Sequence, residues 1–128
     1  DAVGKLHLFL SASIYRSWYA NFNAVRVVPS SALTGVEYGK AVAYHPGVRL
    51  IKLAGDSKVY AVQTGRTLRW IQTEAFARHF YGDLWHRRVD TVSQTHFDSY
   101  TLGSVIDEVT DYNPGGEIAA QLTPGDEL

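Results

Sequence analysis

Serine, histidine and aspartate, the residue types of a hydrolytic triad, occur close together at Ser93, His96 and Asp98. A working triad needs side chains that converge, and its nucleophile commonly sits on a strained G-x-S-x-G turn. The sequence has no such turn, and the three residues share one short predicted helix. Ser93 suits the N-cap of that helix, because its hydroxyl can accept a hydrogen bond from a first-turn amide. The spacing therefore does not predict a catalytic serine.

Histidines can bind metals or transfer protons, and the chain has five of them. His79 and His86 are separated by about two helical turns, but Gly82 is expected to interrupt a helix between them. The sequence has no H-E-x-x-H or related pattern and no cysteine, so a zinc site with standard spacing is not predicted. We expect these histidines at the surface or in an interface.

Carboxylates gather after residue 106, at Asp107, Glu108 and Asp111. A calcium loop needs alternating Asp or Asn positions before a glycine, and this order does not supply them. The glycines lie at predicted turns and form no phosphate-binding loop. We therefore expect no metal, no cofactor and no enzymatic activity.

Charge and composition argue against several classes of partner. The formal net charge is −1 and no basic tract is present, so a nucleic-acid partner is not expected. No segment approaches the roughly 18 apolar residues of a membrane span. Eight Tyr, five Phe and three Trp supply ring area for a core and for contact surfaces. With no Met in the sequence, Asp1 is expected to follow a cleavage, or the chain is an excised piece.

An internal repeat points more directly to architecture. Like residues recur 64 positions apart, with Val25, Val28, Leu33, Val36, Gly39 and Val42 followed by Val89, Val92, Phe97, Tyr100, Gly103 and Ile106. A Tyr-x-Pro-Gly turn follows each set, at residues 44–47 and 112–115. Repeats are supersecondary units that stack on their neighbours, and they favour scaffold or binding roles over catalysis.

The second copy (residues 45–106) contains a complete predicted unit. Three β-branched or aromatic runs, separated by turn residues, predict an antiparallel meander. The runs are residues 48–53, 58–63 and 67–71. Thr73 then caps a helix that ends at Gly82. We predict an α+β chain of two tandem repeats, each with a small antiparallel β-sheet (a meander) and short helices packed on one face.

The first copy (residues 1–44) begins near the counterpart of the third strand and so lacks its leading strands. Leu6, Leu8 and Leu10 alternate with other residues and predict a strand with an unpaired edge. Residues 107–128 are predicted to be an acidic linker followed by a strand-like tail, the start of a third copy.

The tail supplies a surplus predicted strand of Glu117, Ile118, Ala119, Ala120, Gln121 and Leu122. It could pair with its own chain, insert beside Leu6, Leu8 and Leu10 of a neighbouring molecule, or serve as a linker. Insertion in series is head-to-tail β-augmentation, which builds a filament unless the rotation closes a ring. The sequence leaves these three alternatives open.

Aromatic side chains are the remaining candidates for binding. Trp18 and Tyr19 are adjacent, so both cannot point equally well into one core. We predict an interface or glycan-stacking role for this pair. Trp70 and Trp85 lie within apolar patterns and are expected to pack in the core.

The second copy resembles a known tandem repeat. Its L-I-K, V-Y-A-V, L-R-W-I and Y-T-L-G runs begin at Leu50, Val59, Leu68 and Tyr100. They are similar to a repeat of predicted exported and surface proteins of uncultured, small-genome bacteria. The resemblance covers about residues 4–106, and no catalytic residue or cofactor comes with it. It implies an extracellular, non-enzymatic module.

We therefore expect an extracellular structural subunit that assembles with copies of itself by donating its C-terminal strand to the first repeat of a neighbour. The alternative is a cell-surface module that binds glycan or cell wall through exposed Tyr and Trp. A membrane span and a nucleic-acid partner are expected in neither case.

Overall fold

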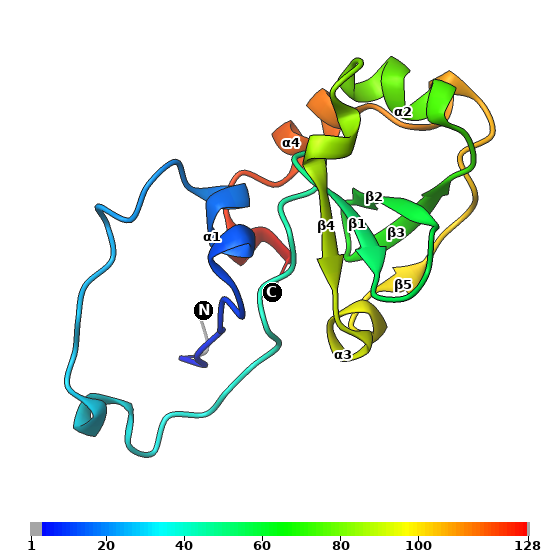
Figure 1. Cartoon of the computed structure of the whole chain (residues 1–128). Coiled ribbons are helices and arrows are strands. Elements are labelled where there is room, and N and C mark those ends of the chain that lie inside the picture. Colours follow the sequence, from blue (N-terminus) through cyan, green and yellow to red (C-terminus); the bar gives the residue numbers. More distant parts are fainter. Residues whose placement is uncertain (1–3, 128) are drawn as a thin grey trace.

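The computed structural model describes residues 4–127 and has a single five-stranded mixed sheet with several short helices, an α+β structure (Figure 1). The strands are β1 (Leu50–Leu53), β2 (Val59–Gln63), β3 (Thr67–Ile71), β4 (Val89–Val92) and β5 (Thr101–Leu102). The α-helices are α1 (Ala12–Trp18), α2 (Glu74–Tyr81), α3 (Gln94–Asp98) and α4 (Pro114–Ala120). The 3-10 helices are η1 (Ser30–Leu33), η2 (Trp85–Arg88), η3 (Val109–Asp111) and η4 (Pro124–Glu127).

The strands lie in the order β4-β1-β2-β3-β5. The antiparallel meander of β1, β2 and β3 confirms the prediction for residues 48–71. β4 and β5 add one strand at each edge, and each is parallel to its neighbour, with Val89 opposite Leu50 and Leu102 opposite Leu68. The complete sheet is therefore mixed rather than purely antiparallel.

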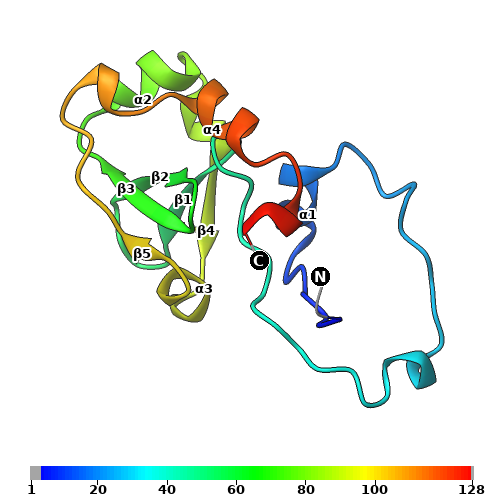
Figure 2. The same ribbon diagram turned by 180° about the vertical axis from the view of Figure 1, so that it is seen from behind.

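Both faces of this sheet are covered. Ile51 and Tyr60 belong to a buried cluster that includes Ile14 of α1, whereas Leu50 and Ala61 belong to a second cluster that includes Ala77 of α2. Figure 2 shows α2 and α3 on opposite sides of the strands. The prediction that the helices pack on one face is therefore wrong. Consecutive apolar residues in β1 and β2 point to alternate faces, so both faces need a cover.

The predicted helix starts at Thr73 and Ser93 are confirmed. The Thr73 hydroxyl accepts a hydrogen bond from the Phe76 amide at 3.3 Å, and Ser93 accepts one from the His96 amide at 3.3 Å. α2 ends at Gly82, whose φ of +80° is a backbone conformation that glycine adopts without strain. Local capping chemistry therefore sets these helix boundaries.

The segment around Leu6, Leu8 and Leu10 is not a strand. Within residues 4–10, Leu6 alone forms a β-bridge, a parallel one with Tyr38. The alternation is also not the expected one, because Leu8 and Leu10 are exposed whereas Phe9 packs against the core cluster of Ile14. A strand needs a partner along its length, and the described residues supply this segment with one at a single position only.

The predicted strand at Glu117–Leu122 is wrong, because its first four residues belong to α4. Asn113 caps this helix by accepting a hydrogen bond from the Gly116 amide at 3.2 Å, and Pro114 occupies the first turn. Proline suits that position because the first-turn amides have no partner within the helix. The Asn-Pro pair therefore starts a helix here instead of a turn into a strand.

Candidate interaction surface

Residues 19–35 leave α1 as a wide loop that carries η1 away from the sheet, and the chain returns to the sheet through residues 36–47 (Figure 1). Every residue in this open loop is exposed. Val27 is 99% exposed and Val28 is 54% exposed, although valine is among the residues most often found inside proteins. An extended apolar segment with this exposure is a candidate surface for a partner.

The base of the open loop is held where residues 36–44 cross the segment containing Leu6. The Gly39 amide donates to the Leu6 carbonyl at 2.8 Å, and the Val42 amide donates to the Leu8 carbonyl at 2.8 Å. The His7 ring also lies 2.7 Å from the Lys40 carbonyl oxygen through its Nδ1 atom. A side chain at Gly39 would collide with that ring in its present position, so glycine leaves room for the ring at the crossing.

The predicted acceptor strand lies at this crossing. Leu6 contributes the bridge to Tyr38, and the side chains of Leu8 and Leu10 face solvent. The predicted donor, residues 117–122, is not brought into pairing with it. The role of these leucines as an acceptor remains a prediction.

The C-terminal segment instead closes back on its own chain. Thr123, Pro124 and Gly125 line a cleft of about 400 Å³ together with Lys5, Leu6, His7 and Phe9. In α4, Glu117 accepts a hydrogen bond from the Thr64 amide at 2.8 Å. The structure therefore has a helical tail that packs on its own chain without strand pairing among the described residues, and insertion into a neighbouring molecule stays a prediction.

His45 joins α1 to this tail. Its ring is buried, with Nδ1 at 3.1 Å from the Ser17 carbonyl oxygen and Nε2 at 3.2 Å from the Ile118 carbonyl oxygen. A neutral imidazole can donate through only one nitrogen, so one of the two contacts is a hydrogen bond in that form. The His45 ring therefore connects the C-terminal end of α1 to α4 in the tail.

Trp18 and Tyr19 do have different environments. The Trp18 ring stacks on His45 at 4.1 Å between centroids, and its Nε1 donates to the Ala43 carbonyl at 2.8 Å. Tyr19 is 40% exposed and is the first residue of the open loop. The geometry gives Trp18 a packing role, and a contact role for Tyr19 remains a prediction.

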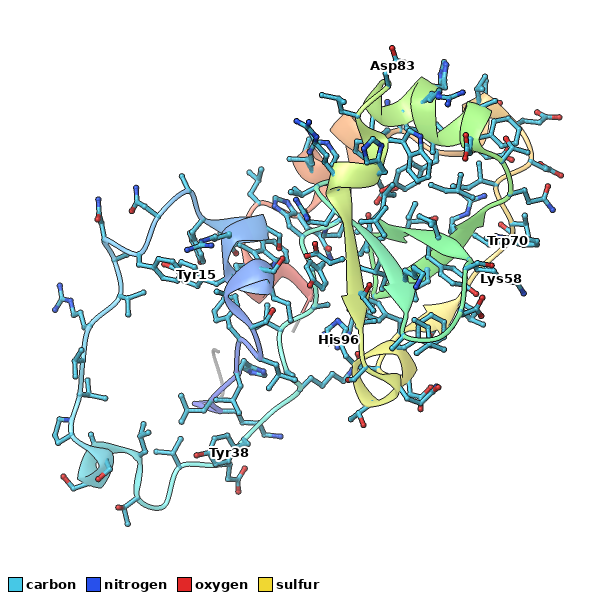
Figure 3. The ribbon with its side chains drawn as sticks, viewed as in Figure 1. Tyr15, Tyr38, Lys58, Trp70, Asp83 and His96 are labelled. Atoms are coloured by element: carbon cyan, nitrogen blue, oxygen red, sulfur yellow. The ribbon has the colours of Figure 1, made fainter. Side chains whose placement is uncertain are left out.

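Tyr19 belongs to an aromatic cluster beside the open loop. Tyr15 and Phe22 stack with centroids 4.7 Å apart, and Phe9 meets Tyr15 edge to face at 5.2 Å. Arg16 lies 5.1 Å from the centroid of Phe22. The cluster anchors the start of the open loop on α1, where Figure 3 shows Tyr15.

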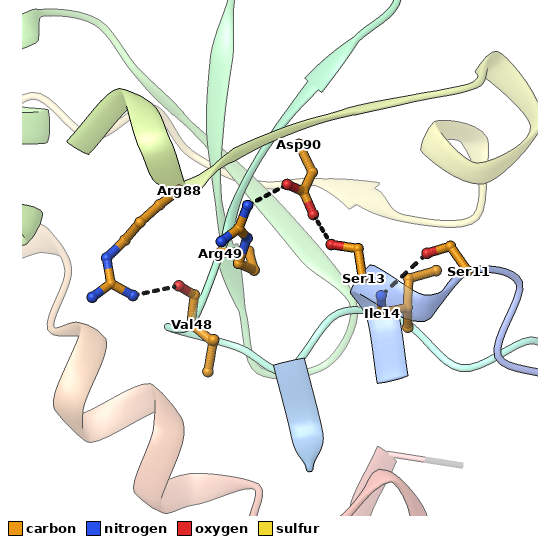
Figure 4. Close-up of polar contacts among 7 residues, drawn as sticks. All are labelled: Ser11, Ser13, Ile14, Val48, Arg49, Arg88 and Asp90. Atoms are coloured by element: carbon orange, nitrogen blue, oxygen red, sulfur yellow. Dashed lines mark hydrogen bonds and ion pairs between the residues drawn. The ribbon is translucent and has the colours of Figure 1, made fainter. Parts of the chain in front are cut away.

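A polar junction connects α1 to the sheet (Figure 4). Asp90 of β4 accepts hydrogen bonds from Ser13 of α1 and from Arg49, which precedes β1. Burial opposes the charge of Asp90, but hydrogen bonds from Arg49, Ser13 and Tyr44 outweigh it and hold the pKa of this carboxyl below its usual range. Sequence reasoning missed this junction because its members are far apart in the chain.

The residues of the possible triad do not converge. Ser93 is engaged as an N-cap, and exposed Asp98 accepts a hydrogen bond from Gln94 at 2.7 Å. His96 is buried with its Nε2 at 3.1 Å from the Tyr100 hydroxyl, and burial lowers the pKa of its imidazole. Among the described residues, no group of His, Asp and Glu side chains is placed to hold a metal ion.

Trp70 and Trp85 line a cleft of about 270 Å³ at the end of the sheet. The cleft also presents Lys58, Gln72 and Glu74. The Lys58 ammonium lies 4.8 Å from the centroid of a Trp70 ring (Figure 3). Each indole is only partly buried and packs against a core cluster, so the two rings serve the core and the cleft together.

Comparisons with protein-family models, with curated proteins and with solved structures found no match. In the part of the chain that the structure describes, no helix is long and apolar enough to cross a membrane. The resemblance to an exported tandem repeat therefore remains a prediction.

Proposed function

We propose that this chain is a non-enzymatic structural subunit of an extracellular assembly. In this proposal it contains two copies of one repeat unit, and the first copy joins it to copies of itself. The open loop carries the proposal, because an exposed apolar segment beside a complete sheet favours contact with another molecule. The extracellular setting rests on the sequence resemblance alone.

Contacts at matching positions support the two-copy organisation. Three contacts at the first crossing have counterparts in the second copy. The contact of Gly39 with Leu6 corresponds to that of Gly103 with Leu68, and the contact of Val42 with Leu8 corresponds to that of Ile106 with Trp70. The contact of His7 with Lys40 corresponds to that of Arg69 with Ser104. The bridge between Leu6 and Tyr38 likewise corresponds to the pairing of Leu68 with Leu102. Gly4 and Arg66 also match, since both have a positive φ, of 79° and 58°.

These matches define the alignment of the copies. The crossing segments are 64 residues apart, as the sequence repeat indicates, whereas Leu6 and Leu68 are 62 residues apart (68 − 6). By this spacing Leu6 corresponds to buried Leu68, and Phe9 corresponds to buried Ile71. Leu8 corresponds to partly exposed Trp70 and Leu10 to exposed Gln72, which agrees with the exposure of both leucines.

The copies differ in what covers them. Val92 in β4 is 7% exposed, and its counterpart Val28 is 54% exposed. β4 has β1 beside it, whereas residues 25–28 have no strand partner among the described residues. Donation by the tail would require α4 to unfold and to release Glu117 and Ile118, so we assign the joining role to the open loop.

Sedimentation velocity over a range of concentrations tests this proposal, with electron microscopy of the largest species. We expect concentration-dependent association that Val28→Asp weakens, because the new carboxylate would be buried in the contact. Val109→Asp is a matched control on the surface of η3, where Val109 is 42% exposed. A chain that remains monomeric at every concentration would contradict self-association.

A second candidate function is glycan binding at the cleft of Trp70 and Trp85. The observation in its favour is the combination of two indoles with Lys58, Gln72 and Glu74 at one concave site. Quenching of tryptophan fluorescence by polysaccharide, saturable and lost on Gln72→Ala with Glu74→Ala, would support it. Tryptophan fluorescence that does not change as polysaccharide is added would exclude glycan binding at this cleft.

A further inference from the structure

We propose that the first copy is the acceptor for a β-hairpin supplied from outside the described residues. The hairpin inserts between residues 25–28 and residues 5–9. This inference rests on the two-copy organisation of the proposed function, and it names the chemistry of the partner. The position of the hairpin, the directions of its two strands and one of its charges follow from comparison with the second copy.

The second copy contains the template for the insertion. The hairpin of β1 and β2 lies between β4 and β3, with β1 parallel to β4 and β2 antiparallel to β3. Residues 25–28 correspond to β4 (Val89–Val92), and the segment containing Leu6 corresponds to β3. Two strands are therefore absent at the equivalent place in the described first copy.

The exposure of individual valines agrees with a missing neighbour. Val28 corresponds to buried Val92, so an inserted strand would cover it. Val27 corresponds to Thr91, which is exposed even in the complete sheet. Val27 should therefore tolerate a charge that Val28 does not.

The conformation of Gly4 fits a hairpin turn. In the second copy, Gly65 and Arg66 both have positive φ in the turn between β2 and β3. Gln63 pairs with Thr67, so this turn has three residues, and three-residue hairpin turns commonly end in a residue with positive φ. Gly4, with a φ of +79°, corresponds to Arg66, so its backbone is suited to a strand that enters through such a turn.

One charge is reversed between the copies and specifies the partner. In the second copy, Asp90 pairs with Arg49, which immediately precedes β1. The first copy has Arg26 at the position of Asp90, and Arg26 is exposed. An incoming hairpin should therefore carry an acidic residue where this chain has Arg49.

This chain's own β1–β2 hairpin is not available to a neighbour. Leu50 and Ile51 are 0% exposed, and both strands are paired within the sheet. Release of the hairpin would expose the core of the second copy. The occupant is therefore a separate hairpin of the same apolar pattern, with the reversed charge.

The C-terminal segment is the present neighbour of the acceptor. Thr123, Pro124 and Gly125 share a cleft with Lys5, Leu6, His7 and Phe9, so we expect a hairpin that pairs with this segment to displace them. The contacts of α4 with Thr64 and His45 lie outside this cleft and can persist. Insertion therefore exchanges a local contact of the tail for a strand pairing.

A covalent extension tests the inference in the full chain. A copy of residues 46–65 carrying Arg49→Glu is placed directly before Gly4, and hydrogen exchange is measured at residues 25–28. We expect exchange at least about tenfold slower than in the unextended chain, with faster exchange at residues 121–125. The same extension with proline at the positions of Ile51 and Ala61 is the control, because proline cannot donate to a sheet.

Further arms distinguish the charge and the source of the hairpin. An extension that retains Arg49 should protect residues 25–28 less, and Val28→Asp should abolish protection where Val27→Asp does not. The free peptide, added in excess, shows whether a separate molecule can enter. If residues 25–28 are protected only when the hairpin is covalently linked, the donor belongs to the same polypeptide. If the free peptide also protects them, a neighbouring molecule can supply the hairpin.

The inference and the proposed function fail differently. Equal exchange with the designed and the proline-containing extensions would overturn the hairpin acceptor, even if the unextended chain self-associates. A monomeric unextended chain that is protected by the extension would overturn self-association and retain the acceptor. A designed extension that both protects residues 25–28 and suppresses self-association would support both.

Discussion

In the proposed two-copy organisation, the first and second copies hold the same crossing of two chain segments, yet only the second crossing lies within the five-stranded sheet. Gly39 and Gly103 donate to equivalent carbonyl groups at 2.8 Å in both. Val28 and Val92 are equivalent in sequence, but one is half exposed and the other is buried. Val92 lies in β4 beside β1 of the β1–β2 hairpin, whereas Val28 has no strand partner among the described residues. We infer that local contacts are sufficient for the crossing and that burial depends on an adjacent hairpin.

The largest expected difference between the copies comes from their equivalent leucines. Leu68 is 0% exposed, so Leu68→Ala should lower the free energy of unfolding by about 2–5 kcal/mol through lost transfer energy and an internal cavity. Leu6 is partly exposed at the equivalent position, so Leu6→Ala should cost less than about 1 kcal/mol. Urea unfolding followed by tryptophan fluorescence measures both. Equal losses would show that the first copy has a core of its own.

The next effect concerns the junction through which the first copy is attached to the sheet. Asp90→Asn removes the negative charge of the side chain that accepts hydrogen bonds from Ser13 and Arg49. We expect a loss of about 1–3 kcal/mol, because a charged partner is left with a weaker acceptor. Hydrogen exchange of α1 compared with β2 locates the loss, which should be larger in α1. Gln94→Ala is a control on the exposed surface.

The same carboxyl should control stability at acidic pH. Its pKa is lower in the folded protein than the ordinary 3.8, so the unfolded state binds a proton more readily. The stabilisation is complete above pH 3.8 and is lost as the pH falls through the lowered folded pKa. Unfolding titrations should therefore show a steeper acid decline in the natural chain than in Asp90→Asn. Parallel curves for the two proteins would remove Asp90 from the explanation.

Glycines at the two crossings provide a test of intermediate size. A side chain at Gly103 would approach the Thr67 Cγ2 atom to 2.7 Å, and one at Gly39 would collide with the His7 ring. Gly103→Ala should cost about 1–3 kcal/mol by overpacking a complete sheet. Gly39→Ala should cost less, since the His7 ring can turn away, although it would separate Leu6 from Tyr38. Amide exchange at residues 39 and 103 compares the two crossings directly.

The sequence was sufficient for the features that depend on neighbouring residues. Thr73 and Ser93 cap helices as expected, because a capping hydroxyl acts within three residues of its own position. The β1–β2–β3 meander was equally accessible, since short turns join its strands. Asn113 and Pro114 also carried a helix-start signal, but the repeated Tyr-x-Pro-Gly pattern led to its interpretation as a turn before a strand.

The features that were missed depend on distant partners. The parallel pairing of β4 with β1 joins Val89 to Leu50, and neither local sequence specifies the other. The Asp90 junction likewise needs Ser13 and Arg49 from two separate segments. For the candidate site, the sequence indicated that the first copy lacks leading strands. It did not show that the apolar side chains within residues 19–35 are exposed to solvent, because the exposure of a residue depends on which elements of the fold lie beside it.

The smallest expected effect compares the two N-caps. Ser11 accepts a hydrogen bond from the Ile14 amide at 3.1 Å, and Thr73 accepts one from the Phe76 amide at 3.3 Å. Ser11→Ala and Thr73→Ala should each destabilise their helix by about 0.5–2 kcal/mol.

The consequence of each cap should nevertheless differ between the copies. α2 packs on the enclosed sheet, so the Thr73 loss should appear in global unfolding. α1 leads into the open loop, so the Ser11 loss should appear first as faster amide exchange within α1. With the designed hairpin extension in place, the first copy should resemble the second, and the Ser11 loss should move into the global transition. If the extension leaves the Ser11 effect local, the difference between the copies does not arise from the missing hairpin.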